Sequence, residues 1–399
     1  MEAFHFTEMP YPAVPEDYME RWGSARVVLP NHLFDPKLGH ELYNRYLDQW
    51  EYADELGYNI MLNEHHQTIT CLDTIVPVTA AMLVRRTRQA KILMIGHPLG
   101  ARMQPVRVAE ETAMLDVVSG GRILCGFVRG VPGETHPANM NPTTNLERFR
   151  EAYELIVKAW TTPEPFSWEG KHFQYRYVNV WPQPYQKPHP PIWTSGSGGE
   201  DTLHWAAERR ITYATLFAPW DRLAVYVQEY HKHARACGWE PTPRSFAYAL
   251  MCFVGETDEE AQRDGEQLMW YLSTRQARGF WYPPGHVAVE ATKRGWQPGA
   301  KVAGSAGAAR AGIQMDYQSL QKAGVFVVGS PDTVIRRFKE LHGLGVGNVL
   351  MMMHAGPMSQ ETTFKSMKLF AEHVLPAIRE FDAPAVNGVP QRAGVGTSA

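Results

Sequence analysis

The sequence predicts an α/β fold in which eight parallel strands close into a (β/α)8 barrel with insertions. Eight short apolar runs, each typical of a buried strand, recur along the 399 residues. Stretches with apolar residues at helical spacing lie between most of them, as at Leu42, Tyr46 and Trp50. Strands that alternate with helices predict a parallel sheet, and eight is the number of strands that closes such a barrel.

The predicted strands follow one another along almost the whole chain. Their ranges are 3–6, 59–63, 91–95, 122–127, 191–194, 212–217, 246–254 and 346–353. An open doubly wound sheet is the alternative arrangement for such a series. Its dinucleotide-binding motif needs a third glycine, and the run Gly196-Ser-Gly198-Gly199-Glu-Asp201 has aspartate at that position. We therefore favour the barrel.

Two long stretches interrupt the alternation of strands and helices. Residues 161–190 are rich in proline and aromatic residues, and residues 278–328 combine an aromatic cluster with a Gly/Ala-rich run. Loops of this length in a compact domain are often functional. We expect both to belong to one domain at residues 1–382, with a lid at 278–300 and a disordered tail at 383–399.

The composition is that of a soluble globular enzyme, with a formal net charge of −3. Such a charge gives no basic surface for nucleic acid or for a membrane. No apolar run is long enough to span a bilayer and no signal pattern opens the chain, so we expect a cytoplasmic protein. The four cysteines form no C-x-x-C pair, which argues against a cysteine metal site and a disulfide framework.

The second predicted strand leads into Glu64-His65-His66, at the end of a barrel strand where catalytic residues are found. Imidazole exchanges protons near neutral pH, so these side chains are candidates for acid–base chemistry. The alternative is a structural polar cluster at the barrel mouth. We expect no metal, because adjacent histidines rarely chelate one ion and no H-E-x-x-H motif is present.

Two further features suggest an anion site. Arg129 follows the fourth strand, and a guanidinium suits phosphate, although a surface salt bridge is the alternative. Residues 194–202, Thr-Ser-Gly-Ser-Gly-Gly-Glu-Asp-Thr, follow the fifth strand and open a helix. Amides at a helix start favour phosphate, and a plain capped turn is the alternative. We call residues 197–202 the anion cradle.

A third strand end carries Gly96-His97, where Gly and Pro flank a histidine. Such a segment suggests tightly turned backbone near a ligand, and an ordinary loop histidine is equally consistent with the composition.

In this order the motifs resemble those of the bacterial luciferase-like flavin monooxygenases, over almost the whole chain. The similarity lies in Glu64-His65-His66 and in the segments 104–116, 119–122, 125–130, 190–193, 329–332, 366–370 and 374–376. The resemblance implies an eight-stranded barrel that binds FMN. It also implies that relatives pair through early helices, so we expect a homodimer or a higher homo-oligomer.

Several site residues are implied by this resemblance. The FMN phosphate would meet Arg129 and the anion cradle, with Arg148 as a second cationic contact. The cofactor-binding residues would be Gly96, His97, Arg129, Arg148, Ser195, Ser197, Gly198, Gly199 and Thr202. His65 matches the catalytic histidine of the family, flanked by Glu64 and His66.

The sequence also departs from luciferase itself. Gly96-His97 falls where luciferase has a non-proline cis peptide bond beneath the flavin, and a histidine there is unusual. Val128 replaces a reactive cysteine, and residues 11–38 form a longer segment. Oxidation of an aldehyde with light emission is therefore not implied.

Our hypothesis is that reduced FMN reacts with O2 and that a flavin C4a-(hydro)peroxide then oxygenates a small organic substrate. A dry aromatic pocket suits this chemistry, with Tyr11, Phe280, Trp281 and Tyr282 as candidate lining residues. No NAD(P)H motif is present, so a separate flavin reductase would supply reduced FMN. The alternatives are a deazaflavin-dependent dehydrogenase, a non-catalytic flavin-binding protein and, more remotely, a barrel that acts on sugars.

Overall fold

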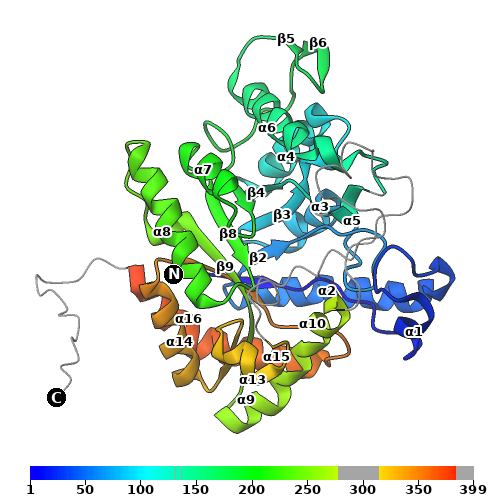
Figure 1. Ribbon diagram of the computed structural model, residues 1–399, viewed down its shortest axis with the longest axis vertical. Coiled ribbons are helices and arrows are strands. Elements are labelled where there is room, and N and C mark those ends of the chain that lie inside the picture. Colours follow the sequence, from blue (N-terminus) through cyan, green and yellow to red (C-terminus); the bar gives the residue numbers. More distant parts are fainter. Residues whose placement is uncertain (131, 136, 277–313, 383–399) are drawn as a thin grey trace, which may run out of the picture.

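The eight predicted strands form a closed parallel barrel in a computed structural model, which describes residues 1–130, 132–135, 137–276 and 314–382 (Figure 1). The barrel strands are β1 (Glu2–Phe6), β2 (Asn59–Leu62), β3 (Ile92–Pro98), β4 (Ile123–Val128), β7 (Ile192–Ser195), β8 (Thr212–Leu216), β9 (Phe246–Val254) and β11 (Asn348–Met352). The ring closes between β11 and β1, in a register that runs from Glu2 opposite Asn348 to Phe6 opposite Met352. The predicted fold class is confirmed, and the open sheet is ruled out.

Side chains of the strands alternate between two apolar clusters. Phe4 and Phe6 belong to a cluster with members from strands around the whole ring, and this cluster fills the barrel. Ala3 belongs to the larger cluster between the strands and the surrounding helices. This period of two follows from the pleat of a strand. All nine residues of β9 are buried, because helices and the barrel interior cover its two faces.

The helices pack around the outside of the barrel. They include α2 (Pro36–Glu55), α3 (Val76–Arg86), α4 (Pro105–Ser119), α6 (Asn145–Thr161), α7 (Glu200–Glu208), α8 (Trp220–Ala236), α14 (Pro331–Gly343), α15 (Gln360–Leu369) and α16 (Leu375–Arg379). Proline occupies one of the first two positions of α2, α3, α4 and α14, where its missing N–H has no intrahelical acceptor to lose. None of the helices in the described part of the chain combines the length and apolarity needed to cross a bilayer.

The two long stretches at 161–190 and 278–328 contain strands that were not among the eight predicted ones. Residues 161–190 carry an antiparallel hairpin of β5 (Phe166–Glu169) and β6 (Gln174–Val178), which projects from the body of the molecule (Figure 1). After residue 313, α13 (Tyr317–Lys322) leads into β10 (Phe326–Gly329). β10 pairs with the last four residues of β9, beyond the point where β8 stops. The lid predicted at 278–300 and the tail at 383–399 lie outside the described residues.

This architecture brings the candidate residues to one end of the barrel. In a parallel barrel, all strands end at the same face, and the loops after them form the site. The loops after β1, β2, β4 and β7 therefore share one mouth, and they carry Glu8, His65, Arg129 and Gly199 respectively.

Candidate active site

Glu64 is a buried anion fixed where β2 gives way to α3. The backbone N–H of Val76, the first residue of α3, donates to Glu64 Oε2 at 3.0 Å, as expected for a carboxylate at a helix N-terminus. Arg102 Nη2 donates to its two oxygens at 2.5 and 2.7 Å, and His66 Nε2 lies 3.0 Å from Oε1.

These contacts decide the protonation of Glu64. Burial acts to raise the pKa of its carboxyl, but the hydrogen bond from His66 and the charge of Arg102 outweigh it and hold that pKa below the usual value. A carboxylate whose pKa is lowered in this way is ionised at neutral pH, so it orients its partners and is a poor proton donor. Through these contacts Glu64 holds the side chains of His66 and Arg102 in place.

His65 lies between two buried carboxylates. Its Nδ1 is 2.8 Å from Glu134 Oε1, and its Nε2 is 3.7 Å from Glu8 Oε1. Burial acts to lower the pKa of His65, but Glu134 and Glu8 outweigh it, so the net pKa is raised above the ordinary value. The side chain of His65 is 15% exposed. His65 is thus held ready to carry a proton at the barrel mouth.

Glu8 and Glu134 complete this cluster, and neither was predicted from the sequence. Glu8 follows β1 by two residues and is buried, and its Oε1 accepts a hydrogen bond from the hydroxyl of Tyr271 in α10 (Met269–Gln276). Glu134 lies in the short helix α5 (Pro132–Thr135), and its Oε2 is 3.7 Å from His66 Nε2. The position of Glu8 just past a strand end was a usable signal, whereas nothing in the local sequence marked Glu134.

His97 lies within β3, which continues to Pro98 beyond its predicted end at residue 95. The register between β3 and β4 shifts at Ile95 to His97, and the peptide bond between Ile95 and Gly96 is cis. The His97 ring is fully buried and meets the edge of the Phe127 ring, with centroids 6.1 Å apart. Burial, followed by the charge of Arg102, lowers its pKa to about 4, so the imidazole is neutral at pH 7.

The His97 ring nitrogens have no hydrogen-bond partner among the described residues. A buried polar group without a partner is costly and calls for a ligand or water. Gly96 is required beside it, because a Cβ there would lie 2.4 Å from Val128 Cγ2. These two positions are therefore shaped by close packing against β4.

Arg129 and the anion cradle lie in the loops that follow two paired strands. β4 pairs with β7, with Gly126 opposite Trp193, and Arg129 follows β4 as Gly196 follows β7. The Arg129 side chain is exposed, and within residues 1–130, 132–135, 137–276 and 314–382 it makes no ion pair. Its backbone carbonyl accepts from Asn145 Nδ2 at 2.9 Å, which fixes the loop.

Some backbone amides of the anion cradle already donate a hydrogen bond within the protein, and others do not. Gly198 has φ +78° and donates its N–H to the Tyr213 hydroxyl at 3.0 Å, so this amide is already used. A Cβ at Gly199 would meet no atom within 4 Å. The amides of Glu200 and Asp201 open α7 and, as first-turn amides, have no intrahelical acceptor. Ser195, Ser197 and Thr202 lie around this turn as predicted from the sequence order, each at least partly exposed.

Arg148 holds a neighbouring loop. It extends from α6, and its Nε and Nη2 donate to the carbonyls of Gly100 at 3.3 Å and Arg102 at 3.1 Å. Its guanidinium also lies over the Phe173 ring, 4.6 Å from the centroid. These contacts support the turn that carries Arg102 and so connect Arg148 to Glu64.

Tyr11 lines a pocket of about 470 Å³ formed by the segment that precedes α2. Its hydroxyl donates to the Leu33 carbonyl at 3.3 Å and accepts from the Asp35 N–H at 2.9 Å. Gln67, which follows His66, lines the same pocket. Phe280, Trp281 and Tyr282, the other predicted pocket residues, lie outside the described part of the chain.

Among curated proteins, the chain is similar to the uncharacterized protein y4wF of Sinorhizobium fredii. The two are 32% identical over 199 residues, which is 46% of this chain and 56% of that protein. The match therefore spans little more than half of the relative.

Solved structures share the fold over a larger part of the chain. The monooxygenase RslO1 of Streptomyces bottropensis has a TM-score of 0.70 at 23% identity, covering 94% of this chain and 99% of that one. The oxygenating constituent of 3,6-diketocamphane monooxygenase of Pseudomonas putida, in complex with FMN, has a TM-score of 0.70 at 21% identity, covering 94% and 97%. An F420-dependent secondary alcohol dehydrogenase has a TM-score of 0.63 at 14% identity, covering 84% and 94%.

A family model described as luciferase-like monooxygenase matches residues 26–348. This range contains the histidine cluster after β2, Arg129 and the anion cradle, together with seven of the eight barrel strands in whole or in part. The chain belongs to the luciferase-like monooxygenase family.

Proposed function

We propose that this protein is a flavin-dependent monooxygenase that uses reduced FMN and O2 to oxygenate a small organic substrate. One observation carries the proposal. An exposed guanidinium, a row of helix-start amides and a histidine between two carboxylates lie in the loops after β4, β7 and β2, at one mouth of the barrel. Family membership supports the reaction class.

The residues present fit a phosphorylated flavin. Arg129 offers a charge that no described residue neutralises, and the first amides of α7 add a positive helix end. The two acidic side chains at this end have partners of their own, since Asp201 lies 3.2 Å from Arg150 Nη2 and Glu200 lies 3.5 Å from His204 Nε2. Open space around Gly199 leaves room for a phosphate.

When bound, reduced FMN would supply the electrons that activate O2, through the C4a-(hydro)peroxide named above. The part proposed for the protein is to bind, orient and manage protons. His65, with its raised pKa, would hold a proton near neutral pH and donate it at the reacting centre. Glu134 and Glu8 would set that pKa, and Glu64 would hold His66 and Arg102 in place.

A separate flavin reductase and a homodimer or higher homo-oligomer are also part of the proposal. The run at residues 196–201 ends in Asp201 where a nicotinamide-dinucleotide motif needs glycine, so reduction elsewhere is the simpler source of reduced FMN.

The second candidate is a deazaflavin-dependent dehydrogenase, which the shared fold with the F420-dependent enzyme supports. Such an enzyme would transfer a hydride to or from its substrate without O2. The same barrel mouth would hold the cofactor phosphate, so cofactor preference and oxygen use separate the two candidates.

The test starts with anaerobic titration of the full chain with reduced FMN and with reduced F420. We expect tighter binding of FMN and, on mixing with air, a near-ultraviolet absorbance band that outlasts the adduct formed by free FMN. A lifetime equal to that in free solution, or a clear preference for F420 with oxygen-independent hydride transfer, would overturn the monooxygenase proposal.

A further inference from the structure

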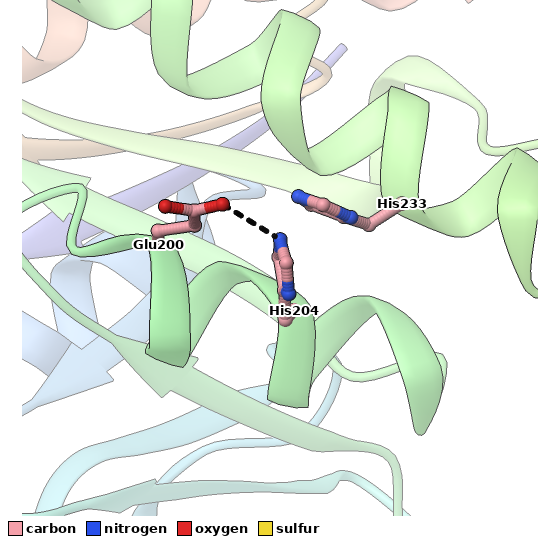
Figure 2. A group of neighbouring side chains, drawn as sticks. All are labelled: Glu200, His204 and His233. Carbon is pink, nitrogen blue, oxygen red and sulfur yellow. Dashed lines mark ion pairs between the residues drawn. The ribbon is translucent and has the colours of Figure 1, made fainter.

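Glu200, His204 and His233 converge between α7 and α8, two helices that carry none of the residues of the His65 cluster. Glu200 and His204 are one helical turn apart on α7, and His233 reaches toward them from the last turn of α8 (Figure 2). The spacing i, i+4 puts the first two on one face of their helix. Two packed helices thus supply three side chains to one point.

The distances between these groups fit a metal ion. Each residue offers one ligand atom, and the three atoms lie within 4.8 Å of one another. His204 Nε2 is 3.5 Å from Glu200 Oε1. Ligands at about 2.0–2.1 Å from a tetrahedral Zn²⁺ are about 3.4 Å apart, so this pair already has the required separation.

No hydrogen bond between described residues explains the closeness of the two histidines, although each lies near one carboxylate. Their ring centroids are 3.1 Å apart at an interplanar angle of 60°. The Nε2 atoms of both are buried and make no hydrogen bond to any described residue. Glu229 Oε2 is 3.7 Å from His233 Nε2, beyond hydrogen-bond distance, and it is paired with Lys232 at 3.1 Å. Two neighbouring imidazoles whose Nε2 atoms make no hydrogen bond within the described chain are donors that a transition metal takes.

We propose that Glu200, His204 and His233 form a binding site for a divalent transition metal of the Zn²⁺ class, with water as the fourth ligand. Two imidazoles and a carboxylate favour Zn²⁺, Co²⁺ or Ni²⁺ over Mg²⁺ or Ca²⁺. The ion would join the first turn of α7 to the end of α8. Since Glu200 directly follows Gly199, it would also fix the helix start that forms the anion cradle.

The side chains of the site lie at the surface of the folded protein, although the Nε2 atoms of the two histidines are buried. Glu200 is 79% exposed and His204 is 45% exposed, whereas His233 is 16% exposed. An ion can therefore enter without unfolding of α7 or α8, and binding is testable on the intact chain.

The test is a titration of the metal-stripped full chain with Zn²⁺ by calorimetry, and with Co²⁺ by visible absorption. We expect one Zn²⁺ site and the visible spectrum of tetrahedral Co²⁺. His233→Ala and His204→Ala should each weaken this site at least about tenfold, because loss of a direct ligand costs no less than loss of a residue that supports one. At one fixed Zn²⁺ concentration, the Tm should rise more for the wild-type chain than for either ligand variant.

His172→Ala is the matched control, since His172 also pairs with a surface glutamate, Glu147, at 3.1 Å but has no second histidine in that pair. It should leave Zn²⁺ affinity unchanged. Far-UV circular dichroism without metal shows whether each variant is folded. No binding by the wild-type chain, or equal binding by the folded double variant of His204 and His233, would overturn the proposal.

Discussion

Replacing Glu134 by glutamine is expected to lower the pKa of His65. The carboxylate of Glu134 lies 2.8 Å from His65 Nδ1 and favours the protonated ring, while burial of the ring favours the neutral form. Glutamine keeps the size and an acceptor oxygen but removes the charge. Burial should then outweigh the charge of Glu8 that remains, and the pKa of His65 should fall below its ordinary value.

The size of the effect follows from the contact. A hydrogen bond to a charged group contributes about 1.5–3 kcal/mol. At about 1.4 kcal/mol for each tenfold change in a proton-binding constant, the pKa of His65 should fall by about one to two pH units. Glu8, 3.7 Å away on the other side of the ring, remains in place and limits the fall.

The assay is an NMR titration of protein labelled at histidine. The resonance of His65 is assigned by its absence in His65→Gln. Glu147→Gln is the control, because Glu147 pairs with His172 at the surface and should leave His65 unaffected. A pKa of His65 that stays the same or rises in Glu134→Gln would refute the arrangement described above.

Three further predictions concern stability and activity. Burial raises the pKa of Asp73 from 3.8 to about 7. The protonated carboxyl therefore contributes about 4 kcal/mol to the free energy of unfolding at low pH, and this contribution is lost as the pH rises through 7. Urea unfolding of Asp73→Asn should show a smaller pH dependence between pH 4 and 8, and an unaltered dependence would count against this. His65→Gln should reduce turnover by about 10²–10⁴-fold with little change in FMN affinity; full activity would remove its proposed role. Gly198→Ala, with a Cβ 2.1 Å from Tyr226 and φ at +78°, should lose about 1–3 kcal/mol of stability, and an unchanged Tm would contradict the packing.

The barrel was predictable from the sequence because its strands are short, apolar and regularly separated. All eight predicted ranges fall on barrel strands, with ends that differ by at most three residues. β10 was missed because its four residues follow a long Gly/Ala-rich run, where no alternation marks a strand. The β5–β6 hairpin lies in a stretch that was expected only as a long loop, since proline and aromatic residues give no clear period.

Site residues were predictable from the sequence only where they directly follow a predicted strand. Glu64, His65 and His66 were found in this way, but Glu134 approaches His65 from 69 residues away, and only folding reveals that contact. The burial of His97 depends on a register shift between β3 and β4 that periodicity does not encode. The Gly198 N–H donates to the Tyr213 hydroxyl from the next strand, β8, and this contact is likewise visible only in the fold.

The proposed phosphate contact at Arg129 is tested most directly by the affinity of Arg129→Ala for reduced FMN and for reduced riboflavin. The wild-type chain should prefer FMN, and the variant should lose about 1.5–3 kcal/mol of FMN binding, roughly 10–150-fold, with riboflavin unchanged. Equal FMN affinity in both proteins, or a parallel loss for riboflavin, would contradict the proposed site.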